Sequence, residues 1–124
     1  MTDSKIIDSS IWIEYFSNKK YSEVIESKEL LYVSTLSLFE IKKKLLKEKI
    51  NQSVISEIIT FIKKRAITIP VEEIIAEKAA EISINHKLHT ADAIIYTTAI
   101  LNNSILITGD NDFRGLKNAI IIDK

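Results

Sequence analysis

The sequence contains no cysteine, one proline and two glycines among its 124 residues. Without cysteine the chain can form neither a disulfide nor a thiolate metal site, and thiol catalysis is excluded. The scarcity of glycine and proline leaves no segment that resembles a linker, and no repeat or low-complexity tract occurs. Because 46% of the residues are hydrophobic, we expect residues 1–124 to form a single domain with one compact core.

The sequence also lacks an excess of charge and a long apolar run. Seventeen basic residues balance seventeen acidic ones, so no overall positive field predicts a nucleic-acid-binding protein, although residues 42–47 and 63–65 form local basic clusters. No segment approaches the roughly 20 apolar residues that a membrane span needs, and the N-terminus does not have the pattern of a signal peptide. We therefore expect a soluble protein of the cytoplasm, without contact to a membrane.

Hydrophobic periodicity predicts strands that alternate with helices. Short apolar runs predict strands at 5–8, 30–34, 66–70, 104–108 and 119–123. Helical spacing of apolar residues predicts helices at 9–17, 36–50, 53–65, 71–87 and 90–103. The expected N-caps are Ser9 or Ser10, Ser34 or Thr35, and Thr90. Strands that are apolar on both faces indicate an α/β fold, a three-layer α/β/α sandwich with a central, mostly parallel sheet of about five strands.

Acidic residues lie where parallel sheets bind ligands, beyond the carboxyl ends of the strands. Asp8 ends the first strand, and Asp110 and Asp112 come at the end of the fourth. Asp92 lies in the first turn of the helix before that strand, and Glu40 lies early in the helix after the second. These side chains can therefore converge at one edge of the sheet. Clustered carboxylates repel unless a cation separates them, and oxygen ligands without cysteine favour Mg²⁺ or Mn²⁺.

These residues also have ordinary structural explanations, and Asp110 and Asp112 could simply be loop residues. Asp8 could cap the helix that follows it, and Asp92 could complement the dipole of its helix. Glu40 could form a surface ion pair with Lys44, which lies one turn further along the same helix. Sequence reasoning alone leaves these explanations open.

Two other metal-site interpretations are weaker. The D-x-D pattern from Asp110 resembles the start of a calcium loop, but Arg114 and Ile121 occupy the fifth and twelfth positions, where oxygen ligands are required. His86 and His89 lie within no recognisable metal-site pattern. We interpret both histidines as ordinary loop residues.

The ordered motifs resemble those of PIN-domain nucleases, and most closely the VapC-type toxins of prokaryotic toxin–antitoxin pairs. The matching segments span nearly the whole chain and are IIDSSIWI, LSLFEIKKKL with Glu40, HTADAIIYTTAI and LITGDNDFRGL. The most specific part is the A-D-A helix start about a dozen residues before a strand that ends in T-x-D-x-D-F. The resemblance implies a parallel sheet flanked by helices, a divalent-metal site and endoribonuclease activity.

The resemblance also implies roles for individual residues. The implied catalytic residues are Asp8, Glu40, Asp92 and Asp110. The implied metal ligands are Asp8, Asp92 and Asp110, with Asp112 as a further ligand, a replacement for Asp110 or a residue that holds the loop. Ser10 and Thr108 match small hydroxylated positions that could bind a phosphate or orient a carboxylate.

Together these roles imply hydrolysis of RNA by a metal-activated water, which leaves a 5′-phosphate and a 3′-hydroxyl. The lysines at 42–47 could then follow the RNA backbone or form a solvated helix face. The family further implies a homodimer and an antitoxin protein on the apolar surface near Trp12, Tyr15, Phe16 and Phe39, although Trp12 and Phe16 also fit a core role. The alternative function is a non-catalytic PIN-like module that binds RNA or a partner protein.

Overall fold

The computed structural model describes residues 4–122 and has a five-stranded sheet in the order β3-β2-β1-β4-β5. All neighbouring strands pair in parallel. The strands are β1 (Lys5–Ile7), β2 (Leu31–Ser34), β3 (Ile67–Ile69), β4 (Ile105–Thr108) and β5 (Ala119–Ile121). The predicted fold class is confirmed. The end of the last predicted strand, Asp123, lies outside the described residues.

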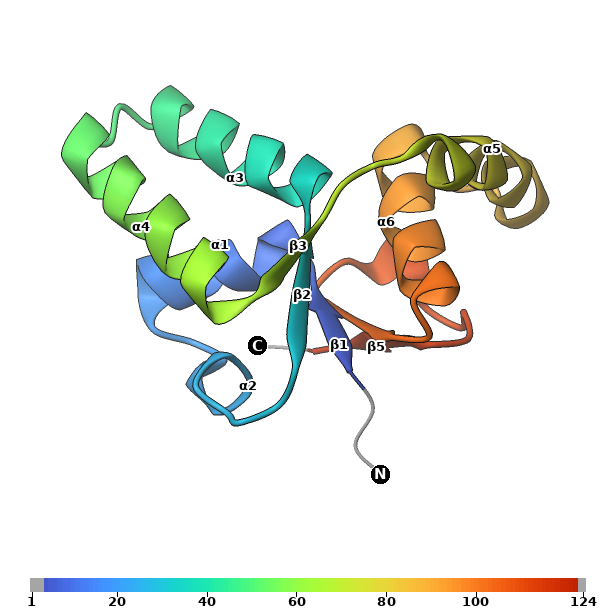
Figure 1. Cartoon of the computed structure of the whole chain (residues 1–124), viewed down its shortest axis with the longest axis horizontal. Helices are drawn as coiled ribbons and strands as arrows, with labels where there is room; N and C mark the ends of the chain where they lie inside the picture. Colours follow the sequence, from blue (N-terminus) through green and yellow to red (C-terminus); the bar gives the residue numbers. More distant parts are fainter. Residues whose placement is uncertain (1–3, 123–124) are drawn as a thin grey trace.

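Helices cover both faces of this sheet (Figure 1). One face carries α1 (Ser9–Asn18), α2 (Ser22–Ile25), α3 (Thr35–Lys47) and α4 (Gln52–Arg65), and the other carries α5 (Glu73–His86) and α6 (Thr90–Leu101). A 3-10 helix, η1 (Asn111–Phe113), follows β4. The sequence pattern missed α2 because four residues are too few to show a helical period. Within the described residues, no helix has the length and apolar character needed to cross a membrane.

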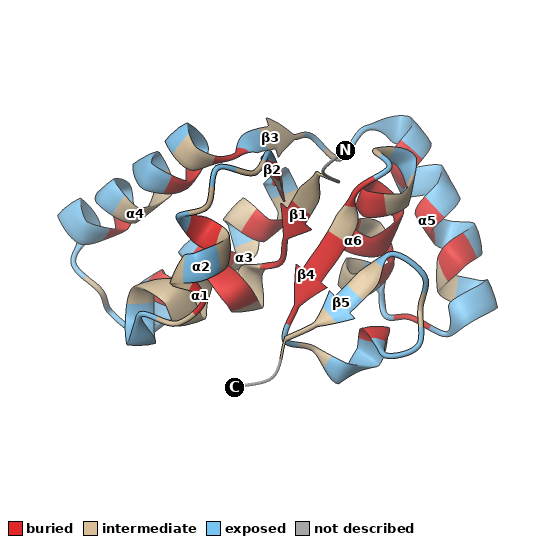
Figure 2. Cartoon of the chain, turned by 90° about the horizontal axis from the view of Figure 1, so that it is seen from below, coloured by how far each residue is buried: buried red, intermediate tan, exposed pale blue. Residues whose placement is uncertain are grey.

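The apolar strands face two separate hydrophobic clusters because successive side chains of a strand point to opposite sides. Ile7 and Ile107 belong to the cluster under α1 to α4. Their neighbours Ile6 and Leu106 belong to the cluster under α5 and α6. Figure 2 shows that β4 is mostly buried. The continuous apolar runs that predicted these strands therefore reflect burial on both faces.

Trp12 on α1 belongs to this core. Its side chain has 0% exposure, and its ring stacks on Phe16 at a centroid distance of 6.5 Å. The core interpretation of Trp12 is therefore correct, and its own side chain offers no surface to a partner. Tyr15 and Phe16 remain partly exposed, and Phe39 is exposed.

Two of the predicted helix caps are wrong by one or two residues. Asp8 caps α1, because its Oδ1 accepts a hydrogen bond from the backbone N–H of Ser9 at 2.8 Å. His89 occupies the N-cap position of α6 without a side-chain cap bond, and Thr90 is already helical. Ser34 caps α3 as predicted, accepting from the N–H of Leu36 at 3.1 Å.

The basic cluster at 63–65 is also divided by the fold. The Arg65 guanidinium points inward and donates to the backbone carbonyls of Ile25, the last residue of α2, and of Ser27 and Glu29 in the segment between α2 and β2. Only Lys63 and Lys64 of this cluster are exposed. Arg65 is therefore a structural residue and offers no charge to a ligand.

The connections of the sheet diverge between β1 and β4. The chain leaves β1 over one face to reach β2, whereas it returns from β3 to β4 over the opposite face through α5 and α6. The adjacent ends of β1 and β4 are joined by the Asp8 N–H, which donates to the Ile107 carbonyl at 3.0 Å. Ligands of parallel α/β sheets bind beyond the carboxyl ends of strands at such a switch point.

Candidate active site and metal centre

Asp8 is a buried carboxylate, with 8% exposure, at this switch point. Its Oδ1 caps α1, and its Oδ2 accepts hydrogen bonds from Thr108 Oγ1 at 2.7 Å and from Ser10 Oγ at 3.1 Å. Burial raises the pKa of Asp8, the three hydrogen bonds oppose that rise, and the charge of Asp110 adds to it. Asp8 can therefore cap α1 and belong to the candidate site at the same time, because each of its carboxylate oxygens has its own hydrogen-bond partners.

The hydroxyls of Ser10 and Thr108 link Asp8 to the chain beyond β4. Ser10 Oγ accepts from the N–H of Gly109 at 3.1 Å, and Thr108 Oγ1 accepts from the N–H of Asp110 at 3.0 Å. Each hydroxyl therefore donates to Asp8 and accepts from the β4–η1 turn. The sequence suggested that these hydroxyls bind a phosphate or orient a carboxylate. Their hydrogen bonds to Asp8 fit the second role.

Three further carboxylates lie together at the same edge. One oxygen each of Asp92, Asp110 and Asp112 can be chosen so that all three lie within 4.8 Å of one another. Asp92 comes from the first turn of α6, whereas Asp110 caps η1 by accepting from the N–H of Asp112 at 2.9 Å. The D-x-D spacing thus brings both carboxylates of the turn toward Asp92.

The pKa of Asp92 is raised to about 6. Partial burial is the largest cause, followed by the negative charges of Asp110, Asp112 and Asp8, and a nearby His89 lowers it. This influence of Asp8 places it in the same electrostatic cluster as the other three carboxylates.

Glu40 joins the cluster from α3. It accepts a hydrogen bond from Ser9 Oγ at 3.1 Å. Burial raises the pKa of Glu40, the Ser9 hydrogen bond opposes this, and the charge of Asp8 adds to it. The surface ion pair with Lys44 is not formed, because Lys44 pairs with Glu48 at 3.0 Å.

The five acidic residues fit a divalent cation. Within residues 4–122, no lysine or arginine forms an ion pair with any of them. No lysine or arginine therefore relieves the repulsion within the cluster, and His89 opposes it at Asp92 only as the smallest of the influences on that pKa. The three carboxylates that meet, those of Asp92, Asp110 and Asp112, offer oxygen ligands alone. This donor set suits Mg²⁺ or Mn²⁺.

Sequence reasoning missed the contributions of His89 and Ser9. His89 lies at the start of α6 and acts electrostatically on Asp92, three residues later. Ser9 holds Glu40 from a different helix. The i,i+3 spacing of His89 and Asp92 could have indicated their interaction from the sequence. The contact between Ser9 and Glu40 depends on tertiary packing and leaves no such pattern. The prediction that His86 lies in a loop is wrong, because His86 is the last residue of α5, where its ring lies against Tyr96.

Solved structures with this fold include prokaryotic toxin complexes. The chain is similar to a toxin–antitoxin complex from Klebsiella pneumoniae (TM-score 0.80, 22% identity, 97% of this chain and 99% of that chain). It is also similar to VapBC2 from Rickettsia felis bound to a promoter DNA fragment (TM-score 0.77, 15% identity, 97% of this chain and 98% of that chain). A third similar structure is VapC20 from Mycobacterium tuberculosis, a toxin that cleaves the sarcin-ricin loop (TM-score 0.70, 14% identity, 96% of this chain and 89% of that chain).

At these identities the similarity establishes the fold. Comparison with curated protein sequences finds no match. The model of the PIN domain family, in contrast, matches residues 5–118, which include all of the acidic residues described above. This chain therefore belongs to the PIN domain family.

Proposed function

We propose that this protein is a divalent-metal-dependent endoribonuclease and the toxin of a toxin–antitoxin pair. The observation that carries the proposal is the convergence of five carboxylates at the switch point of the sheet, with no ion pair to a lysine or arginine among the described residues. Membership in the PIN domain family and the similarity to toxin complexes support it. Non-catalytic binding of RNA or a partner is the competing function.

In this proposal Asp8, Asp92 and Asp110 hold Mg²⁺ or Mn²⁺, and Asp112 is either a further ligand or a residue that holds the turn. When bound, such an ion neutralises phosphate oxygens and lowers the pKa of water. Ser10 and Thr108 keep Asp8 in place through their hydrogen bonds.

Glu40 has a raised pKa and lies at the edge of the cluster. It orients the attacking water and accepts its proton. The water oxygen attacks phosphorus, the P–O3′ bond breaks, and the leaving 3′ oxygen takes a proton from solvent. The products then carry a 5′-phosphate and a 3′-hydroxyl.

The partners in this proposal are an RNA substrate, a cognate antitoxin and a second copy of the chain. We place the protein in the cytoplasm, with residues 1–124 acting as one domain. The partly exposed aromatic cluster of Tyr15, Phe16 and Phe61 is the surface that we assign to the antitoxin, since these rings contact one another between α1 and α4. Compared with the surface expected from the sequence, this one keeps Tyr15 and Phe16 and leaves out the buried Trp12 and the ring of Phe39 on α3.

The proposal is tested by incubating an end-labelled structured RNA, and total bacterial RNA in parallel, with the purified protein. Cleavage is expected with Mg²⁺ or Mn²⁺ and none with EDTA, with 5′-phosphate ends on the products. The Asp92→Asn variant, purified in the same way, is the control against a contaminating nuclease. Equal cleavage by the wild type and the variant would reject catalysis at this site, and calorimetric binding of Mn²⁺ without cleavage would favour the binding module.

Metal affinity is expected to increase with pH. Because the pKa of Asp92 is about 6, a proton competes with the ion below that value, and the raised pKa values of Asp8 and Glu40 act in the same direction. Titration calorimetry with Mn²⁺ should give an affinity about tenfold weaker near pH 5 than near pH 7.5. A pH-independent affinity across this range would show that Asp92 is not a ligand.

A further inference from the structure

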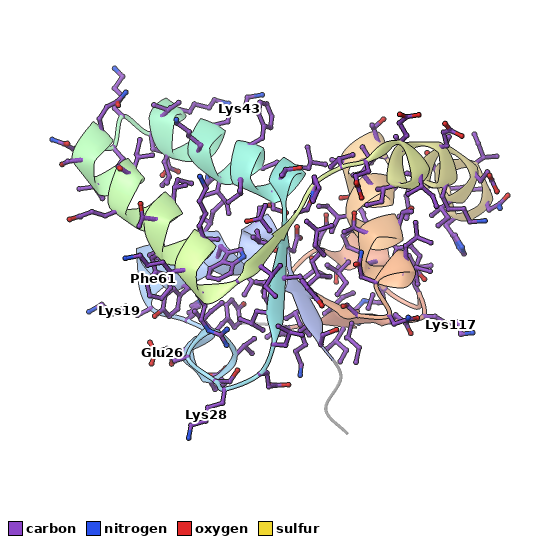
Figure 3. All side chains as sticks on the ribbon, viewed as in Figure 1. Lys19, Glu26, Lys28, Lys43, Phe61 and Lys117 are labelled. Carbon is purple, nitrogen blue, oxygen red and sulfur yellow. The ribbon has the colours of Figure 1, made fainter. Side chains whose placement is uncertain are left out.

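Phe39 lies directly before Glu40 on α3, and its side chain is 59% exposed. The Nζ atom of Lys43, one turn further along, lies 5.7 Å from the centre of the Phe39 ring. Figure 3 shows Lys43 on the outer side of α3, whereas Phe61 lies on the side of α4 that faces α1 and α2. The Phe39 ring is thus a feature separate from the aromatic cluster assigned to the antitoxin.

A groove of about 470 Å³ runs between α3 and α4 beside this ring. Its walls carry four apolar side chains, among them Phe39, Leu46 and Ile59, and three lysines, which are Lys42, Lys43 and Lys63. No acidic residue lines it. Among the described residues, none of these lysines forms an ion pair, in contrast to Lys44, which is held by Glu48.

The combination of exposed apolar side chains and unpaired lysines around this groove is unlike a solvated helix face. A solvated face would present its lysines together with polar residues, whereas here Phe39 and Leu46 are 59% and 46% exposed beside the lysines. A ligand that fits must have planar or apolar groups together with negative charge. Unpaired RNA has both, because its bases stack on aromatic rings while its phosphates contact lysine.

We propose that Phe39 is a platform on which an unpaired RNA base stacks, and that Lys42, Lys43 and Lys63 contact the phosphates around that base. The platform rests on the proposed function, since it names how RNA is held beside the proposed site. Phe39 directly precedes Glu40 on α3, and Glu40 accepts a hydrogen bond from Ser9 on the side of the carboxylate cluster. The platform and the proposed site therefore lie within the same turn of α3, on different sides of the helix.

The experiment measures binding, so that it does not depend on cleavage. Fluorescent oligoadenylate and oligouridylate are titrated with full-length protein in an Asp92→Asn background, with Mg²⁺ present, and the Kd is followed by anisotropy. Phe39→Ala and Phe39→Leu are each expected to weaken binding of oligoadenylate roughly tenfold, and binding of oligouridylate less, because purines stack more strongly. Phe39→Trp should retain the affinity, and its indole fluorescence should be quenched by RNA.

The contribution of the lysines is measured separately, through the dependence of RNA binding on salt concentration. Lys43→Ala and Lys63→Ala should each reduce the slope of log Kd against log salt concentration by about 0.7. The matched control is Ile84→Ala on α5, which truncates an apolar side chain that is 78% exposed and lies away from the groove. It should leave RNA affinity unchanged.

Several results would overturn the platform. Unchanged affinity of Phe39→Leu would show that the ring face is not used, and loss of affinity in Phe39→Trp would contradict stacking. If Phe39→Ala binds RNA normally but dissociates a homo-oligomer in sedimentation, or loses an acidic partner protein, the groove serves that contact instead. Phe39-dependent RNA binding without cleavage by the wild type would uphold the platform and reject the nuclease proposal.

Discussion

The Asp92→Asn variant is expected to lose RNA cleavage by roughly a hundredfold or more while its metal-free form becomes more stable than the wild type at neutral pH. The loss of activity follows from the removal of one of three carboxylates whose oxygens lie within 4.8 Å of one another. Asparagine nearly preserves the shape of the side chain, and Asp92 accepts no hydrogen bond from the described residues that the change would break. The variant should therefore fold normally.

The gain in stability follows from the sign of the pKa shift. A pKa of about 6, against the ordinary value of 3.8, means that the folded state holds a proton more tightly than the unfolded state. The metal-free fold therefore loses stability as the pH rises from about 4 to about 6, and the full repulsion persists above that range. After allowance for solvent screening at a half-buried site, we expect the variant to gain about 1 kcal/mol, or roughly 4 °C in Tm.

Thermal melts followed by circular dichroism, with EDTA, provide the measurement. The difference between the variant and the wild type should shrink as the pH falls and vanish near about pH 3, below the ordinary pKa of 3.8, where Asp92 is protonated in both folded and unfolded states. Added Mn²⁺ should reverse the order at neutral pH, because only the wild type keeps its full ligand set. A variant that melts below the metal-free wild type at neutral pH would contradict the assignment of unrelieved repulsion at this site.

Replacement of Arg65 by methionine is expected to destabilise the protein by about 3 kcal/mol, which corresponds to a decrease of roughly 10 °C in Tm. The guanidinium donates to the carbonyls of Ser27 and Glu29 at 2.8 and 3.1 Å and also to that of Ile25. Methionine has a similar length and no donor, so the partly buried carbonyls lose a charged partner.

Lys64→Met is the matched control, because Lys64 is the exposed neighbour of Arg65 on α4. It should change the Tm little. Arg65→Lys should recover only part of the loss, since an ammonium group cannot match the planar fork of donors that reaches three carbonyls. The assignment fails if Arg65→Met unfolds within about 2 °C of the wild type, as expected for a surface residue.

The architecture was predictable from the sequence because the strands are buried on both faces. The apolar runs around Ile7 and Leu106 could not come from a sheet with a solvated face, and the helices between them required parallel pairing. The same rule placed Asp8 and Asp110 at one edge, since the carboxyl ends of parallel strands lie together.

Local sequence did not determine which atoms contact one another. The Ser9 and Ser10 hydroxyls, expected as possible caps, instead donate to Glu40 and Asp8, and the cap is Asp8 itself. Three capping-type side chains in succession are equivalent by propensity, and only the packing of α1 against α3 and β4 distinguishes them. Arg65 resembled a member of a basic cluster for the same reason, because no periodicity reports that a side chain points inward.

The contact between Asp8 and Thr108 joins residues that are 100 positions apart in the chain. During translation, Asp8, Glu40 and Asp92 are all present once α6 has been synthesised. Asp8 still lacks its hydrogen bond from Thr108, and Asp92 still lacks the nearby carboxylates of Asp110 and Asp112, until β4 and η1 have been synthesised. Contacts of such separation form late in folding. The nascent chain thus remains without its complete acidic cluster until β4 has docked beside β1, so the order in which the polypeptide is made delays assembly of the proposed site.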